Sequence, residues 1–295
     1  MLNTLKKFSV TVAATTLIAI AVVPAAFAQE PQFQAAHTFT DVNDRYEESV
    51  SFFYEAEIIK GKSPSLFGIY ENLTRGDAAV ILANTLGLDT ENAPDAGFKD
   101  LNDRYKGAVN ALAELGIVSG YSPDKFEPYK PLSRGAMAKL LVLTFDLQDY
   151  AEETPFTDAS GVFEPYIEAL YGSEITSGKT ATTYGTYQEI VRGDFANLLY
   201  KTLLFDPFAP ESVEMVDSNS LSVSFVNAIP EEFTAEETAE IITPFVELSN
   251  GEFLELTPSN GVLSSDRKML TFDHGDLTGK SGTMYIYDFV LPFSY

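Results

Sequence analysis

Hydrophobic residues recur at helical spacing through the middle of the chain. Val109, Leu112 and Leu115 form one apolar stripe, and Gly116 or Gly120 can end the helix that carries it in a left-handed conformation. A loop rich in proline and aromatic residues follows, and after it a second stripe of alanine and leucine begins. The pattern predicts two helices joined by a loop.

The last part of the chain, residues 208–295, alternates between apolar and polar positions instead of following a helical period. Leu221, Val223 and Phe225 fall on one face of a predicted strand. The dipeptide Asn250-Gly251 separates two further apolar runs and is typical of a hairpin turn. This segment therefore predicts a small β-sandwich.

The helical part contains three copies of one series of motifs. An opening Phe-x-Asp motif at residues 39–41 returns at residues 98–100 and 156–158, at spacings of 59 and 58 residues. Each copy continues with a glycine at the end of the first helical pattern and closes on an Arg-Gly pair that precedes the second. Because motifs in register at two nearly equal offsets do not arise by chance, we interpret this part as three structural repeats.

The repeats define the expected domain organisation. A single helix pair cannot bury its apolar face alone, whereas three stacked pairs can share one core. We expect one helical unit with repeats at residues 37–94, 95–150 and 151–207, followed by a β domain at residues 208–295. The expected fold class is multidomain α + β.

The N-terminus has the features of a secretory signal peptide. Lys6 and Lys7 precede an apolar run at residues 8–23, and the small-x-small sequence at residues 26–28 is typical of a cleavage site. The alternative is a membrane anchor, but the run is short for a span of roughly 20 residues. We therefore expect a signal peptide over residues 1–28.

The composition is strongly acidic and lacks cysteine. The chain has 19 Lys and Arg residues against 43 Asp and Glu residues, which disfavours a nucleic-acid partner. Without cysteine there is no disulfide, thiolate metal site or cysteine nucleophile. The histidines are His37 and His274, and no nucleophile-elbow, zinc-protease or phosphate-loop motif is present. We expect no enzymatic activity, no metal and no cofactor.

The repeated motifs resemble the S-layer homology (SLH) domain of bacterial surface proteins. The resemblance implies a pseudo-threefold helical bundle of three helix–loop–helix SLH repeats, whose inter-repeat grooves bind secondary cell-wall polysaccharide, often pyruvylated. Residues 208–295 resemble, through their length and strand alternation, the Ig-like modules of surface proteins. The SLH resemblance rests on Phe39-Thr40-Asp41-Val42, Gly116-Ile117-Val118-Ser119-Gly120, Phe126-Glu127-Pro128 and Leu73-Thr74-Arg75-Gly76-Asp77.

Several positions depart from the family pattern. Ala136 stands where the second Arg motif would be acidic, Val191 removes the hydroxyl cap of the third, and the loop at residues 180–189 lacks the Phe-x-Pro element. We therefore expect at least one weakened groove, foremost the third. The family usually has a tryptophan near the start of the first helix, and the aromatic residues nearest to that position here are Tyr46, Tyr105 and Phe163.

The repeated arginines are the leading candidates for polysaccharide contact. A pyruvyl ketal carries a carboxylate, which a guanidinium can meet with two parallel charge-assisted hydrogen bonds. Free N–H groups at the start of a helix would also favour an anion. The alternative is that the arginines pair with Asp or Glu of a neighbouring repeat and only hold the bundle together. The three are Arg75, Arg134 and Arg192.

Two further sets of repeated residues are candidates for the polysaccharide site. The aspartates of the opening motif are helix-start residues whose carboxylates accept backbone N–H bonds, or else they contact sugar hydroxyls. The glycines that follow the first helix are positive-φ positions, or else their backbone contacts the ligand. The aspartates are Asp41, Asp100 and Asp158, and the glycines are Gly61, Gly120 and Gly178.

The sequence predicts a secreted, non-enzymatic protein of the cell wall and surface layer. It would be anchored non-covalently to secondary cell-wall polysaccharide, with no membrane span after signal cleavage, and other surface-layer subunits are candidate partners. One alternative is an SLH-anchored envelope enzyme. The other is an adhesin, suggested by the Arg-Gly-Asp tripeptides at residues 75–77 and 192–194.

Overall fold

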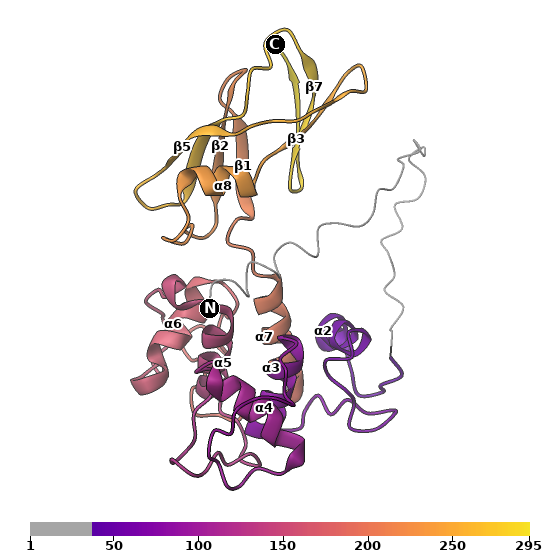
Figure 1. Cartoon of the computed structure of the whole chain (residues 1–295), viewed down its shortest axis with the longest axis vertical. Coiled ribbons are helices and arrows are strands. Elements are labelled where there is room, and N and C mark those ends of the chain that lie inside the picture. The colour runs from indigo at the N-terminus through magenta and orange to yellow at the C-terminus, as the bar shows by residue number, and fades with distance from the viewer. Residues whose placement is uncertain (1–36) are drawn as a thin grey trace. The chain divides into compact units, whose positions relative to one another are not determined.

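The computed structural model describes residues 37–295 (Figure 1), and the predicted signal peptide over residues 1–28 lies outside this range. Within it, helices of the three repeats are followed by two β-sheets. None of the helices in residues 37–295 combines the length and the apolar character that a bilayer crossing requires.

Each repeat contributes two α-helices, as the apolar stripes predict. The second helix of every repeat begins at its arginine, which confirms the prediction drawn from the repeat spacing. Two short 3-10 turns are present: η1 (Gln148–Tyr150) ends the second repeat, and η2 (Gly161–Phe163) lies in the third. The α-helices are α2 (Asp44–Glu55), α3 (Arg75–Thr85), α4 (Asp103–Glu114), α5 (Arg134–Phe145), α6 (Glu164–Gly172) and α7 (Arg192–Leu204).

Side-chain caps explain where most of these helices begin. The Asn43 side chain accepts a hydrogen bond from a backbone N–H of α2, and Asn102 caps α4 in the same way. The hydroxyl groups of Thr74 and Ser133 accept bonds from the third backbone N–H of α3 and α5. Val191, before α7, has no such group, and this helix lacks a side-chain cap as the sequence predicts.

The repeats close into a ring. Helix α3 packs against α4, α5 packs against α6, and α7 returns to pack against α2. At the centre the Leu73 N–H donates to the Ile190 carbonyl (2.9 Å), the Ile190 N–H to the Leu132 carbonyl (2.9 Å), and the Leu132 N–H to the Leu73 carbonyl (2.8 Å). We call these three bonds the axial cycle. Each repeat therefore contacts both others around a pseudo-threefold axis.

One hydrophobic core, drawn from all three repeats, fills this ring. The loop aromatics Phe67, Phe126 and Tyr184 are almost completely buried, at 0–1% exposure. Burial of a side chain of this size stabilises the fold by about 1.5–3 kcal/mol. Tyr184 thus takes the place of the Phe-x-Pro phenylalanine, so the third loop keeps its buried aromatic although its sequence lacks that motif.

The C-terminal region is a sandwich of two four-stranded antiparallel sheets. Their strand orders are β1-β2-β6-β5 and β4-β3-β7-β8. Helix α8 (Ala235–Ile241) lies between β2 and β3 in the chain. The strands are β1 (Pro210–Met215), β2 (Ser220–Phe225), β3 (Phe245–Leu248), β4 (Phe253–Leu254), β5 (Ser259–Leu263), β6 (Met269–Asp273), β7 (Ser281–Ile286) and β8 (Phe289–Ser294).

The two sheets share a second hydrophobic core, separate from that of the helices. Leu221, Val223 and Phe225 all point into it, as the alternating pattern predicts. The predicted hairpin turn at residues 250–251 lies between β3 and β4, which pair antiparallel. The strand order corresponds to the ABED and CFG sheets of an immunoglobulin-type sandwich with one further strand beside C.

Candidate functional site between the repeats

The opening-motif aspartates fold back onto the loop of their own repeat. The Asp41 carboxylate accepts bonds from the backbone N–H groups of residues 67–69 (2.8, 2.7 and 3.2 Å), and Asp158 holds the third loop in the same way. Asp100 accepts two such bonds, because the third position is Pro128, which has no N–H. Burial raises the pKa of these carboxyls, but the backbone bonds outweigh it and leave each pKa below its ordinary value.

The helix-start role predicted for these aspartates is therefore wrong. Asn43 and Asn102 cap the first helices of repeats 1 and 2, whereas the carboxylates act on a loop 26 to 28 residues further along the chain. The physical reason is that a loop with consecutive unpaired N–H groups needs a multivalent acceptor, which a carboxylate supplies. The aspartates shape the loop against which the neighbouring arginine lies.

The positive-φ explanation for the repeated glycines holds at one of three positions. Gly178 has φ +80°, but Gly61 and Gly120 are outside the left-handed region. A Cβ atom at either residue would lie 2.3 Å from a ring carbon of the opening-motif phenylalanine, Phe39 or Phe98. These glycines are therefore required by the close approach of an aromatic ring. The left-handed end of α4 is instead at Gly116, with φ +73°.

Each repeated arginine crosses to the loop of the next repeat. Arg75 Nε–H donates to the Phe126 carbonyl (3.0 Å) and Nη2–H to the Ser119 carbonyl (3.0 Å), while the guanidinium lies 4.5 Å from the centroid of the Phe126 ring. Arg192 makes both corresponding bonds to the first repeat, and Arg134 makes the Nε bond to the third. The arginines thus join the repeats mainly through neutral carbonyl groups rather than acidic side chains.

The first two residues of each second helix have no free N–H group. In α3 the Arg75 N–H donates to the Lys130 carbonyl (2.9 Å) and the Gly76 N–H to the Pro128 carbonyl (2.8 Å). The third N–H donates to its own cap hydroxyl. The corresponding pairs in α5 and α7 are also bonded across a repeat interface. The neighbouring loop thus occupies the first two N–H groups of each second helix, so these two are not free to bind an anion, while the third N–H of α7 has no side-chain cap.

The three arginines differ in their acidic neighbours. The Asp194 carboxylate lies 3.7 Å from Arg134, and the charge of Asp77 acts on Arg192. The corresponding neighbour of Arg75 would be residue 136, which is alanine. Burial lowers the pKa of Arg75 and Arg192, yet both stay charged at neutral pH.

Arg75 is also the most accessible of the three. Arg134 and Arg192 are only 5% and 7% exposed, whereas Arg75 is partly exposed. Among residues 37–295, none of the ion pairs within 4.0 Å involves Arg75. The interface between repeats 1 and 2 therefore contains a partly exposed cation that makes no ion pair within 4.0 Å among residues 37–295, although the charges of Glu127 and Asp100 act on it.

Besides the Arg134–Asp194 pair, acidic bridges join repeats through arginines of the first helices. The Asp77 carboxylate in α3 accepts bonds from Arg104 (2.6 Å) and from the Tyr105 hydroxyl (3.2 Å) in α4. In the same way, a carboxylate of α7 accepts bonds from the Arg-Tyr pair of α2 at 3.1 and 2.9 Å. At the third interface the corresponding positions are Ala136 and Phe163, so this acid and its tyrosine partner are both absent there. The Asn-Asp-Arg-Tyr sequence at residues 43–46 recurs at residues 102–105, but nothing local to it indicates this role.

A tyrosine that the sequence-based interpretation did not include also recurs in every repeat. It lies three residues after the buried loop aromatic in every repeat, and each copy is strongly exposed, at 70%, 64% and 68%. The identical residue at offsets of 59 and 58 was the available sign. The three are Tyr70, Tyr129 and Tyr187.

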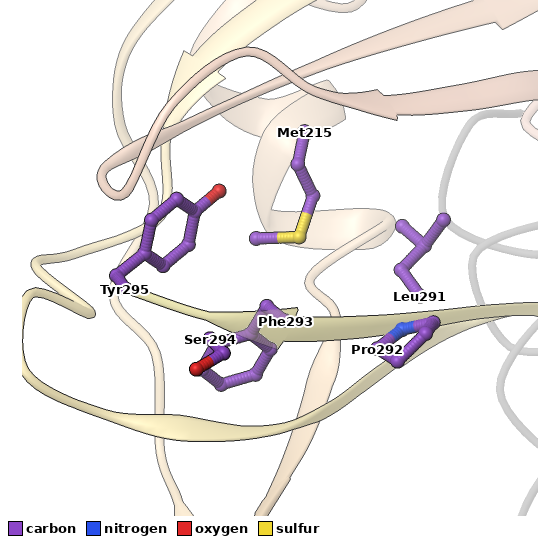
Figure 2. Close-up of a pocket in the computed structure, with 6 residues that line it drawn as sticks. All are labelled: Met215, Leu291, Pro292, Phe293, Ser294 and Tyr295. Atoms are coloured by element: carbon purple, nitrogen blue, oxygen red, sulfur yellow. The ribbon is translucent and has the colours of Figure 1, made fainter.

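The β domain has a shallow pocket of about 340 Å³ between β1 and β8 (Figure 2). Met215 and Phe293 are among its apolar lining, and Ser294 has no histidine beside it there. Nor does any group of three or more His, Asp or Glu side chains within residues 37–295 have the arrangement of a metal site. The pocket therefore supplies no nucleophile with a base, and the repeat interfaces remain the candidate site.

Comparison with known proteins agrees with the repeat geometry. The S-layer homology domain model matches residues 38–79, 97–138 and 155–196. The surface-layer 125 kDa protein of Lysinibacillus sphaericus is 30% identical over 245 residues, which is 80% of this chain and 20% of that protein. The cellulosome-anchoring protein of Acetivibrio thermocellus is 28% identical over 173 residues, or 55% of this chain and 39% of that protein.

Two further similarities are as follows. An endoglucanase of a Bacillus species is 28% identical over 204 residues, covering 64% of this chain and 21% of that enzyme. The solved structure of surface layer protein SbsC, domains 1–6, matches at 13% identity with a TM-score of 0.22, covering 74% of this chain and 27% of that one. The chain spans about a fifth of the length of its surface-layer relative. The chain therefore contains three copies of the S-layer homology domain.

Proposed function

We propose that this protein anchors itself non-covalently to the cell wall by binding an acidic secondary cell-wall polysaccharide, with Arg75 as the principal contact. The observation that carries the proposal is the partly exposed Arg75 guanidinium, which lacks an ion-pair partner among residues 37–295. A polysaccharide carboxylate, such as that of a pyruvyl ketal, is the ligand that a guanidinium fork matches best.

The Arg75 guanidinium has N–H groups that its bonds within the protein do not use. A guanidinium has five N–H donors, and carbonyl groups of the second repeat accept one bond from Nε and one from Nη2. The remaining N–H groups suffice for a bidentate pair with a carboxylate. The Phe126 ring beneath the guanidinium holds it in place, so little side-chain entropy is lost when the ligand binds.

The other repeated residues support the groove indirectly under this proposal. Arg134 and Arg192 are buried and mainly hold the repeats together. The aspartates Asp41, Asp100 and Asp158 hold the three loops, and the glycines at residues 61, 120 and 178 admit the opening-motif phenylalanines. We therefore infer that the groove beside Arg75, the arginine that makes no ion pair within 4.0 Å among residues 37–295, binds most tightly, while the sequence alone predicts only that the third repeat is weakened.

Display on the surface fits the structure better than the alternatives of enzyme or adhesin. The endoglucanase relative shares the repeats, but no described residue here combines a nucleophile, a base and a pocket. The Arg-Gly-Asp tripeptide of the first repeat lies at the start of α3, and its Asp77 is 7% exposed and bonded to Arg104. This tripeptide is therefore not available to a receptor.

The test is sedimentation of the full chain with purified walls of Lysinibacillus sphaericus, before and after chemical removal of the secondary polysaccharide. We expect binding to the untreated walls alone. Arg75→Lys keeps the charge but loses the fork, and a charge-assisted bond contributes about 1.5–3 kcal/mol, so affinity should fall about ten- to a hundredfold. Arg267→Lys is the matched control, because Arg267 also donates to backbone carbonyls but lies in the β domain. Equal binding to stripped walls would refute the proposal.

A further inference from the structure

The exposed tyrosines have one position and one residue type in all three repeats. Their neighbours do not: the following residue is acidic, basic and neutral in turn. A ring that is two-thirds exposed contributes little to the core, so folding alone does not explain its recurrence. The property that the three positions share is therefore an accessible, uncharged aromatic face. We call Tyr70, Tyr129 and Tyr187 the tyrosine triad.

These rings are held in place although they are exposed. The Asn43 side chain donates a hydrogen bond to the Tyr70 hydroxyl (3.1 Å), and Asn102 donates to the Tyr129 hydroxyl (2.8 Å). The third ring, at residue 187, instead contacts the ring of Phe163 edge-on at 6.3 Å. Each cap asparagine therefore has a second role, and the rings are ordered before any ligand arrives.

The triad is arranged around the pseudo-threefold axis. Two residues after each tyrosine, the chain pairs with another repeat, at Asn72 with Val191, at Pro131 with Thr74 and at Glu189 with Ser133. These pairings flank the axial cycle. The three rings consequently belong to one end of the bundle, where a single extended polymer can meet more than one of them.

We propose that the tyrosine triad is a second carbohydrate contact, which stacks on the uncharged faces of sugar rings of the polymer whose carboxylates Arg75 binds. The inference rests on the proposed function. A pyranose has C–H groups on its faces and hydroxyls at its rim, which suits an aromatic ring with a polar tip. Because the charges beside the triad differ in sign, a charged ligand would not be recognised equally at the three positions, whereas a neutral ring would. Repetition also suits a polymer, since linked weak contacts reinforce one another.

The first test compares two triple variants of the full chain on purified Lysinibacillus sphaericus wall polysaccharide, both native and after mild acid treatment, which cleaves any ketal-linked pyruvate. Changing all three tyrosines to alanine should weaken binding to both forms about tenfold or more. Changing all three to phenylalanine keeps the rings and should retain most of the affinity. Phe253→Ala is the control, because Phe253 is 65% exposed in the β domain. Its substitution should leave binding unchanged.

A second readout separates contact from folding. Exposed tyrosines react with tetranitromethane, and the polysaccharide should protect the triad in the wild-type full chain while Tyr295 stays reactive. If Arg75→Lys loses affinity but the triple alanine variant binds normally and the triad stays reactive, the inference is overturned and the proposed function stands. If the triple alanine variant melts early, the protection result decides alone. If wild-type protein binds neither form of the polysaccharide, the proposed function fails and the inference with it.

Discussion

The interfaces of the helical ring are built in two ways, although the repeats share one fold. At two interfaces an aspartate accepts bonds from an Arg-Tyr pair, and Asp77 with Arg104 is one example. At the interface between repeats 2 and 3 the aspartate position is Ala136 and the tyrosine position is Phe163. The comparison shows that the two departures from the family pattern, Ala136 and Phe163, belong to the same interface. An acid without its partners would be buried at a cost, and at this interface both positions are apolar.

The largest expected effect comes from breaking a polar interface. We expect Asp77→Ala and Asp194→Ala each to lower the free energy of unfolding by about 1.5–3 kcal/mol, because each leaves a tyrosine hydroxyl and an arginine unpaired. Urea unfolding followed by circular dichroism at 222 nm measures this. Asp124→Ala, an exposed and loosely paired site, is the control. If the control and the two variants unfold alike, the bridges add nothing to stability.

The next largest effect is expected from placing an acid at the apolar interface between repeats 2 and 3. We expect Ala136→Asp to weaken polysaccharide binding about tenfold, because the new carboxylate would lie beside Arg75 as Asp194 lies 3.7 Å from Arg134. Sedimentation with walls is the measurement. Ala136→Asn, which has nearly the same shape without the charge, should bind like the wild type. Equal losses in both variants would show that shape, and not charge, sets the affinity.

We expect substitution of the aspartates that hold the loops to lower the free energy of unfolding by different amounts in the different repeats. Asp41 and Asp158 each accept three backbone bonds and Asp100 accepts two, so Asp100→Asn should destabilise less than Asp41→Asn, by about 1 kcal/mol. The folded pKa of all three is lowered, so their contribution is present above the unfolded pKa and lost as pH falls through the folded one. Unfolding titrations of the variants between pH 7 and pH 2 would measure both. Equal losses at residues 41 and 100 would contradict this account.

The smallest expected effect is a pH dependence of stability in the β domain, which arises from a buried histidine. His274 is fully buried, neither ring nitrogen has a hydrogen-bond partner, and burial lowers its pKa. The unfolded chain therefore binds a proton first, and the β domain should lose stability as pH falls through the unfolded histidine value near 6.5. Calorimetry of the full chain between pH 8 and pH 5 would show it as a shift of one transition. In His274→Leu this shift should disappear, and its persistence would point to another group.

The sequence predicts the elements of this fold well because their causes are local. Periodic apolar residues, a cap hydroxyl at Thr74 and an arginine before the run are enough to place the start of α3. Partners across the repeats were not predictable in the same way. Nothing near Asp41 shows that its carboxylate reaches a loop 26 residues away, and nothing near Gly61 shows that a phenylalanine ring lies against it. These roles depend on tertiary contacts.

The same distinction applies to the candidate site. The recurrence of Arg75, Arg134 and Arg192 was visible, but their unequal surroundings depend on which repeat each one faces. The surroundings of each arginine depend on which repeats are neighbours, because an arginine of one repeat lies near the acidic position of the next. Repeat spacing alone treats the three grooves as equivalent, and the charges show that they are not.

The return of α7 to α2 has a mechanical consequence. A load applied to the β domain enters the bundle through α7, since β1 follows that helix after a short connection. The force is therefore borne in part by the seam between the last repeat and the first, where Asp194 is bonded to Arg45 and to the Tyr46 hydroxyl. While this seam holds, the axial cycle and all three grooves keep their geometry. Once it opens, the ring is broken and the grooves are lost together, so detachment under tension should occur in one abrupt step.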